Sequence, residues 1–199
     1  MRKLWSYFVP AEPDSVTAEA LVRLYRSGKY AVRPVVEAIL RHPQLYVGPR
    51  MVKPPVVYTA GLLRSLRRRV ENDWFWIDAL AGQQLFYPPN VSGWDDGRWL
   101  DTATFRGRWE VASRALSKTV LDENRVRPAP HDPNALVAWA LSLNGSPTVA
   151  PETRAALLEL CRRVLADAGE DGGKYRSYPL MAVNAARLLL AVAPEQQTC

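Results

Sequence analysis

The amino-acid sequence predicts an all-α protein, an irregular helical bundle of about eight helices with one long loop rich in Pro, Gly and Trp. Three observations support this fold class. Apolar residues recur three and four positions apart along most of the 199 residues, which is the period of an amphipathic helix. Proline, glycine and capping residues separate the periodic stretches. Alternation of apolar and polar residues never continues beyond four positions, so no strand is expected.

The composition is typical of a folded globular protein, with 48% hydrophobic and 23% charged residues. The longest nearly apolar run, residues 180–193, is interrupted by Asn184 and Arg187, and it is shorter than the roughly 20 residues that cross a bilayer. We therefore expect no membrane span. Two cysteines without a C-x-x-C spacing predict neither a disulfide framework nor a metal site, and no cofactor is expected.

The N-terminal part of the chain predicts four helical segments. Leu4, Trp5 and Phe8 recur at helical spacing without a capping residue before them, and we expect the apolar surface around Trp5 and Phe8 to be exposed. Capping residues, prolines and glycines bound the next helices. These helices are expected from Asp14 or Ser15 to Gly28, from Pro34 to Pro43 and from Pro54 to about Val70.

Capping residues, prolines and glycines also bound the remaining helices. They are expected at residues 74–80, from Asp101 or Thr102 onward, and at residues 133–144, 151–168 and 179–192. The helix after the loop carries Phe105, Trp109, Ala112 and Leu116 at positions i, i+4, i+7 and i+11, which predicts a stripe that faces the core. Cys161 lies on the apolar face of its helix, so we expect a buried thiol without a chemical role.

Residues 124–130 form the best candidate for a linker because they are rich in proline and arginine. We therefore predict two parts. A helical domain over residues 1–125 contains the long loop, and a C-terminal helical subdomain over residues 126–199 packs on it.

The loop at residues 86–99 is the most informative segment of the sequence. Pro88 and Pro89 favour an extended approach, and Gly93 permits backbone angles that other residues avoid. One interpretation is a rigid platform on which the indoles stack on a sugar or peptide. Its candidate ligand-binding residues are Asn90, Trp94, Asp95, Asp96, Arg98 and Trp99. The other interpretation is that both tryptophans anchor the loop to neighbouring helices and Asn90 bonds local backbone.

The basic residues form one dense run. The chain carries 26 basic and 20 acidic side chains, a net charge of +6, which does not by itself indicate a nucleic-acid partner. In a helix that reached Val70, Arg64, Arg67 and Arg68 would share one face. This face is interpreted either as solvated helix surface or as a site for nucleic acid. Further basic clusters interleaved with exposed aromatic residues are missing, which argues against nucleic acid as a partner.

Catalysis has little support in the sequence. Asp95, Asp96 and Asp101 could form a general acid and base, but nothing in the sequence fixes their spacing. A solvated turn at Asp95 and Asp96 and a helix cap at Asp101 explain them better. The two histidines, His42 and His131, are too few for a triad or a metal cluster. No residue is assigned a catalytic role.

Several strings together resemble the second half of the bacterial domain of unknown function 1800 family. The most specific is Pro-Pro-Asn-Val-x-Gly-Trp at residues 88–94, and residues 2–9, 39–46, 51–56, 82–87 and 98–99 add to it. Residues 191–199 resemble the end of some members. Two departures affect the loop: Asp95 and Asp96 begin a string where the family has Pro-Gly-Gly-Arg, and Asp101 stands where the family has Asn.

The resemblance implies a helical part of a longer, often exported protein, frequently encoded beside a sulfatase-like protein. The family's His-rich first half is missing from this chain, so we expect a fragment or a split gene product. We hypothesise a non-catalytic interaction or scaffold role, with the first half or the sulfatase-like protein as partner. A hydrolase-like or carbohydrate-acting loop and nucleic-acid binding through residues 64–69 are the alternatives. The sequence carries no secretory signal and leaves the compartment open.

Overall fold

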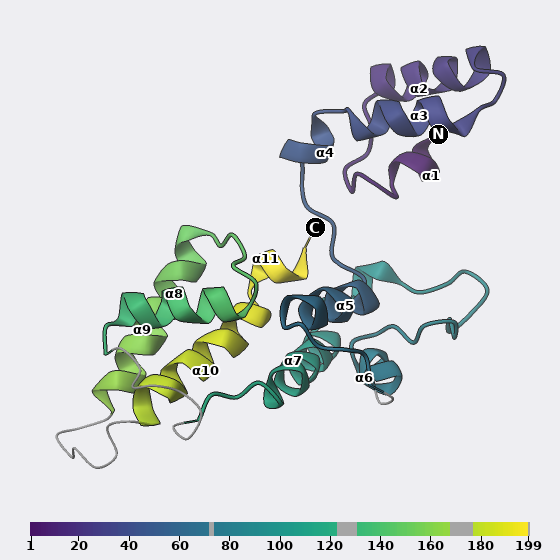
Figure 1. Cartoon of the computed structure of the whole chain (residues 1–199). Coiled ribbons are helices and arrows are strands. Elements are labelled where there is room, and N and C mark those ends of the chain that lie inside the picture. Colours follow the sequence, from purple (N-terminus) through teal and green to yellow (C-terminus); the bar gives the residue numbers. More distant parts are fainter. Residues whose placement is uncertain (72–73, 123–130, 168–176, 199) are drawn as a thin grey trace. The chain divides into compact units, whose positions relative to one another are not determined.

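The structure is a computed structural model that describes residues 1–71, 74–122, 131–167 and 177–198, and these residues form helices and no strand (Figure 1). The predicted all-α class is therefore confirmed. By its contacts the chain divides into two compact units, Met1–Met51 with Thr198, and Val52–Gln197. The linker predicted at residues 124–130, and with it the boundary near residue 125, lies outside the described residues. None of the described helices is long and apolar enough to cross a membrane.

The Met1–Met51 unit is built around two main helices. Its helices are α1 (Arg2–Trp5), α2 (Ser15–Ser27), α3 (Val32–Leu40) and α4 (Gln44–Val47). Helices α2 and α3 pack against each other, and their apolar stripes surround a small core. The core consists of Trp5, Val9, Leu21, Val35 and Ile39.

Trp5 corrects one expectation. The surface around it was expected to be exposed, but the side chain of Trp5 is only 1% exposed. Its indole N–H donates to the carbonyl oxygen of Ala11 at 2.7 Å, and its ring meets His42 edge-on, with centroids 4.9 Å apart. The chain after α1 thus folds back over the ring, which the uncapped helix start did not reveal.

The Val52–Gln197 unit contains the other helices. They are α5 (Pro55–Ser65), α6 (Trp74–Leu80), the 3-10 turn η1 (Asp96–Arg98), α7 (Thr102–Ser117), α8 (Pro133–Leu143), α9 (Pro151–Ala166), α10 (Ser177–Ala191) and α11 (Pro194–Gln197). One core lies between α5, α6 and α7. A second core joins α8, α9 and α10 and contains the buried Cys161, as predicted.

Aspartates begin three of the helices, as the sequence indicated. The carboxylates of Asp14, Asp101 and Asp132 accept backbone N–H bonds from Thr17, Thr104 and Ala135 at 2.7, 2.9 and 3.0 Å. These bonds satisfy amide groups that have no partner inside the helix. Hydrogen bonding to the ionised form also lowers the pKa of Asp14 and Asp101.

Helix α5 is shorter than expected and ends at Ser65 rather than near Val70. Arg67 takes a left-handed conformation with φ of 53°, and the N–H of Arg68 bonds to the carbonyl of Leu63 at 2.8 Å. This is the hydrogen bond of a Schellman ending. An arginine occupies the position where glycine usually marks a helix end, so no residue type signals the end of α5.

Helix α7 has a different buried face from the predicted one. Phe105 and Trp109 were expected in the core, but they are 39% and 41% exposed. Ala112 and Leu116 are buried as predicted. Gly107 and Arg108 take the inward positions near the start of the helix because α6 approaches closely there. The helix is therefore rotated from the orientation that counting apolar residues favours.

Gly107 makes the close packing of α6 and α7 possible. A Cβ atom at this position would overlap the carbonyl group of Leu80. We expect Gly107→Ala to lower the free energy of unfolding by about 3 kcal/mol, since backbone atoms must move to accept the methyl group. Gly61→Ala is the matched control because Gly61 lies within α5 with open space at its Cβ position.

Gly61→Ala should raise stability by about 1 kcal/mol through helix propensity. Urea unfolding of the two variants measures both effects. Equal stability of the Gly107→Ala variant and the unmodified protein would contradict the close approach.

Candidate functional site

Arg108 on α7 is the most deeply buried charged side chain in the described part of the chain, with 0% exposure. Its Nε donates to the carbonyl oxygen of Trp99 at 3.0 Å, Nη1 to Oε1 of Gln197 at 3.2 Å and Nη2 to the carbonyl oxygen of Lys53 at 2.6 Å. The guanidinium also lies 5.2 Å from the ring centroid of Tyr58. One side chain therefore joins three segments that are far apart in sequence.

Tyr58 on α5 completes this buried cluster. Its hydroxyl donates to the carbonyl oxygen of Ala191 at 3.1 Å. Burial raises the pKa of Tyr58 to about 12, so the ring stays neutral over the physiological pH range. Burial lowers the pKa of Arg108, and the negative charge of Asp78 acts in the opposite direction.

Asp78 on α6 is a buried carboxyl group with 7% exposure. The hydroxyl of Thr59 on α5 donates a short hydrogen bond to its Oδ1. Burial raises the pKa of Asp78 to about 6, because the hydrogen bond from Thr59 and the charge of Arg108 only partly offset the loss of water. A titratable group with this pKa in a cavity marks a candidate functional site.

The cavity beside Asp78 has a volume of about 210 Å³ and mostly apolar walls. Helices α5 and α6 and the segment after each of them form it. Its lining residues are Val56, Thr59, Ala60, Leu63, Val70, Trp74, Phe75, Asp78 and Leu85. Trp74 is buried, and its Nε1 has no hydrogen-bond partner among the described residues.

Sequence reasoning missed both Arg108 and Asp78. Asp78 had one local signal, since it is the single acidic residue of the aromatic segment at residues 74–80 and lies four positions after Trp74. That spacing places both side chains on one face of a helix. Arg108 had no signal, because nothing in its neighbourhood separates it from an exposed arginine.

The predicted tryptophan loop extends away from the helices before it returns through η1 (Figure 1). Its polar residues bond to nearby backbone. Asn90 Oδ1 accepts from the N–H of Ser92 at 2.8 Å and Asp95 Oδ1 from that of Gly97 at 3.1 Å. Arg98 pairs with the helix cap Asp101 at 3.4 Å. Asp96 is exposed and begins η1.

The two tryptophans of the loop differ. Trp99 lies against the start of α7, because a Cβ atom on Gly82 would lie 3.6 Å from Trp99 Cδ1 and 3.0 Å from Thr104 Cγ2. Trp94 is half-buried and follows Gly93, whose φ of +92° is in the region that favours glycine. Neither tryptophan lines the cavity beside Asp78.

The first part of the loop exposes apolar side chains. Phe86 is 88% exposed, and its φ of +64° is a costly conformation for a bulky residue. Tyr87 and Val91 are also exposed. On α6, Trp76 is 67% exposed and meets Phe75 edge-on with centroids 5.2 Å apart.

Three of the four arginines at residues 64–69 were predicted to share one helical face, namely Arg64, Arg67 and Arg68. They do not share it, because α5 ends before two of them. Arg64 and Arg67 are exposed. The Arg68 side chain is 9% exposed and pairs with Glu71 at 2.9 Å. It also donates to the carbonyl oxygens of Arg114 and Ala115 at 2.9 and 2.5 Å. Arg68 therefore anchors this segment to the end of α7.

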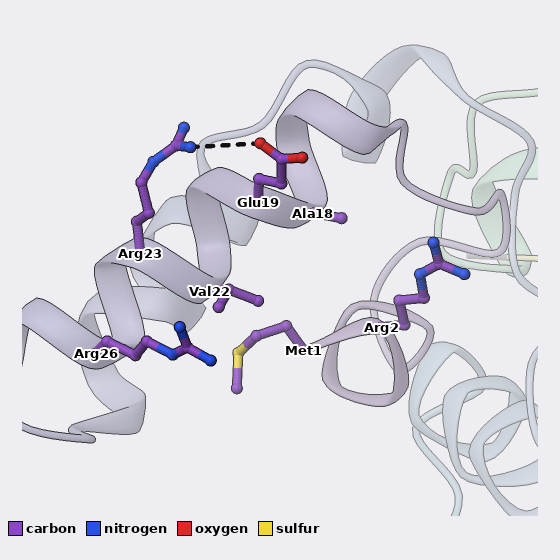
Figure 2. A pocket seen from close by; sticks show the side chains of 7 residues that line it. All are labelled: Met1, Arg2, Ala18, Glu19, Val22, Arg23 and Arg26. Carbon is purple, nitrogen blue, oxygen red and sulfur yellow. Dashed lines mark hydrogen bonds and ion pairs between the residues drawn. The ribbon is translucent and has the colours of Figure 1, made fainter.

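A second hollow lies in the Met1–Met51 unit, between α1 and α2, with a volume of about 380 Å³. Figure 2 shows Met1 and Val22 at its centre, while the guanidinium groups of Arg2, Arg23 and Arg26 point apart from one another. Arg23 is paired with Glu19 at 3.5 Å. The basic side chains thus do not converge on one point where an anion would bind.

The fold and the cavity define an all-helical protein with a buried Asp–Thr pair beside an apolar cavity. The chain belongs to the family described as "Protein of unknown function (DUF1800)", whose model matches residues 1–197. The resemblance seen in the sequence is thereby confirmed. No curated protein and no solved structure matches the chain.

Substitution of Arg108 tests whether its side chain holds the three segments at Lys53, Trp99 and Gln197 together. We expect Arg108→Leu to lower the free energy of unfolding by roughly 3 to 5 kcal/mol, because buried oxygen atoms lose their donors. Arg106→Leu is the control, since Arg106 lies on the same helix and is exposed, and it should change stability by less than about 0.5 kcal/mol. Chemical denaturation compares the two variants, and similar losses in both would refute the assignment.

The raised pKa of Asp78 predicts a pH dependence of stability. The folded pKa of about 6 exceeds the usual 3.8, so the folded protein holds this proton more tightly than the unfolded chain does. The contribution of Asp78 is therefore most favourable near pH 4, declines as the pH rises to 6 and is constant above that.

Asp78→Asn removes the titration, so the variant should gain stability relative to the unmodified protein between pH 4 and pH 7. Guanidinium unfolding at pH 4, 5, 6 and 7 measures the difference. A difference that does not change with pH would show that Asp78 is not buried in this way.

Proposed function

We propose that this chain is a non-catalytic interaction module whose binding surface consists of the exposed apolar residues in the first part of the loop and the exposed aromatic residues of α6. Phe86 carries this proposal. An exposed phenylalanine gains no burial energy, and its left-handed backbone adds a cost of about 1 to 3 kcal/mol. A partner that covers the ring would offset that cost.

The residues around Phe86 suit a protein interface. Tyr87 and Val91 are exposed in the same part of the loop, and Trp76 and Phe75 add aromatic area on α6. Aromatic side chains of this kind dominate the binding energy of many protein interfaces. They also lose little conformational entropy when a partner covers them.

The polar residues of the loop support a non-catalytic role. The carboxylates of Asp95 and Asp101 bond to backbone N–H groups, as expected of a turn and a helix cap. The alternative, a carbohydrate-acting site formed by Asn90, Trp94, Asp95, Asp96, Arg98 and Trp99, has less support. Binding of nucleic acid through Arg64, Arg67 and Arg68 has the least support, because the Arg68 side chain donates hydrogen bonds to the backbone of α7.

The partner that we propose is the His-rich first half of longer proteins of this family. The resemblance of this chain to their second half suggests the pairing, and the exposed aromatic surface supplies an apolar contact area. The sulfatase-like protein encoded beside some relatives is the second candidate partner.

The variant Phe86→Gly separates binding from folding. Glycine accepts the positive φ without strain, so we expect stability to be unchanged or raised, while affinity for the first half of a full-length relative falls at least tenfold. Tyr30→Gly is the matched control, because Tyr30 is also an exposed aromatic residue with positive φ, at 67°, but it lies outside the proposed surface.

Calorimetric titration of each purified variant against the separately produced first half measures the affinities. Loss of binding in Phe86→Gly alone supports the proposal. Equal affinity of Phe86→Gly and the unmodified chain contradicts the proposed surface. Binding only to the sulfatase-like protein contradicts the proposed partner.

A further inference from the structure

The cavity beside Asp78 contains a buried carboxylate that forms no ion pair with the described residues. We propose that the cavity binds a small organic amine, whose primary ammonium group pairs with Asp78 and whose apolar body fills the remaining space. The cavity shares Phe75 with the interaction surface at Phe86, but binding of the amine does not depend on a protein partner.

Asp78 is the group that the ammonium would meet. It lines the cavity and is only 7% exposed. The guanidinium of Arg108 attracts the carboxylate, but its hydrogen bonds go to other oxygen atoms. Buried charges in proteins are usually paired, so a cation is the partner that this carboxylate calls for.

One oxygen of Asp78 is open to the cavity. Oδ1 accepts from Thr59, and Oδ2 accepts no hydrogen bond from the residues that the structure describes. The fully enclosed side-chain atoms without a partner in that part of the chain are Oε1 of Gln44 and the indole nitrogens of Trp74 and Trp99. Oδ2 is not one of them, so it keeps an accessible surface, and the cavity is the space that Asp78 lines.

The polar side chains that line the cavity accept hydrogen bonds and offer no donor. A carboxylate only accepts, and Thr59 uses its hydroxyl proton for Asp78. The indole nitrogen of Trp74 is inaccessible, so Trp74 presents only carbon atoms. A primary ammonium group matches this pattern, because it has three donors and no acceptor. A carboxylate or amide head group would leave its own oxygen without a donor.

The other walls select an apolar body. Val56 and Leu63 line the cavity from α5, and its volume of about 210 Å³ exceeds the roughly 150 Å³ that holds a benzene-sized molecule. Ala60, Phe75 and Leu85 also line it and are exposed. These three residues therefore mark the side from which a ligand enters. An apolar site with one charged group that orients the ligand is typical of small-molecule sites.

Benzylamine is the probe for this site. At pH 7.5 the carboxyl group of Asp78 is ionised, since its pKa is about 6, and benzylamine carries a positive charge. Benzyl alcohol and benzoate have the same ring with a neutral and a negative head group. In calorimetric titrations of the full chain we expect benzylamine to bind about tenfold more tightly than benzyl alcohol, and benzoate not to bind.

Two variants locate the binding. Asp78→Asn removes the charge and should lower the affinity for benzylamine about tenfold while leaving that for benzyl alcohol unchanged. Glu110→Gln is the matched control, because it removes one negative charge from an exposed position that does not line the cavity. Ala60→Trp places a large side chain at the exposed entrance and should abolish the binding of both ligands.

The amine–alcohol comparison on the unmodified chain and the Ala60→Trp variant keep the test decisive even if Asp78→Asn does not fold. No binding of benzylamine to the unmodified chain overturns the proposal, as does equal affinity for benzylamine and benzyl alcohol. Unchanged benzylamine affinity in Asp78→Asn or in Ala60→Trp places the amine elsewhere and also overturns it. Failure of partner binding at Phe86 leaves these measurements unaffected.

Discussion

The Val52–Gln197 unit depends on the burial of one guanidinium group. A charged side chain in the interior costs several kcal/mol unless its N–H groups find acceptors. Arg108 meets this requirement with oxygen atoms of Lys53, Trp99 and Gln197. These residues lie just before α5, near the end of the loop and in α11, so each of those segments is fixed relative to α7. The inward position of Arg108 on α7 meets the same requirement, while Phe105 and Trp109 on that helix are exposed.

A second buried arginine joins the other helices in the same way. Arg187 on α10 donates from Nε to Oδ1 of Asn144 at 3.1 Å and from Nη2 to the hydroxyl of Thr119 at 2.7 Å. Asn184, one turn earlier, exchanges two hydrogen bonds with the backbone of Leu121 at 3.1 and 3.0 Å. Both polar residues interrupt an apolar helix because they bind the chain that leaves α7. These polar contacts, within apolar surroundings, therefore fix α10 against the segment that follows α7 and against the end of α8.

The same buried contacts also account for the positions of the cavity beside Asp78 and of the exposed loop. Asp78 is held by Thr59 and influenced by Arg108, so its carboxyl group stays buried beside an apolar cavity. The loop beyond α6 is fixed at its far end by Arg108 and by the cap Asp101, while its first part carries exposed apolar residues. Exposed apolar residues on a loop that is hydrogen-bonded at one end suit a binding surface, because less of the loop has to be ordered when a partner arrives.

The sequence by itself determined the all-α class, the helix starts at Asp14, Asp101 and Asp132, and the position of the loop. These features depend on residues within about four positions of one another, so local spacing contains the information. The end of α5 was missed because Arg67 takes the left-handed position without glycine. The loop residues were found by their composition, but their partners were not.

Only the tertiary structure decided the roles of Arg108 and Asp78. The hydrogen-bond partners of Arg108 include Lys53 and Gln197, which are 55 and 89 residues away, and Thr59 is 19 residues from Asp78. Whether such a polar side chain is solvated or buried depends on which distant oxygen atoms the folded chain brings to it. The local sequence of α6 and α7 does not indicate where those distant oxygen atoms will lie. The burial of Arg108, the raised pKa of Asp78 and the cavity beside Asp78 therefore arise only when the helices pack.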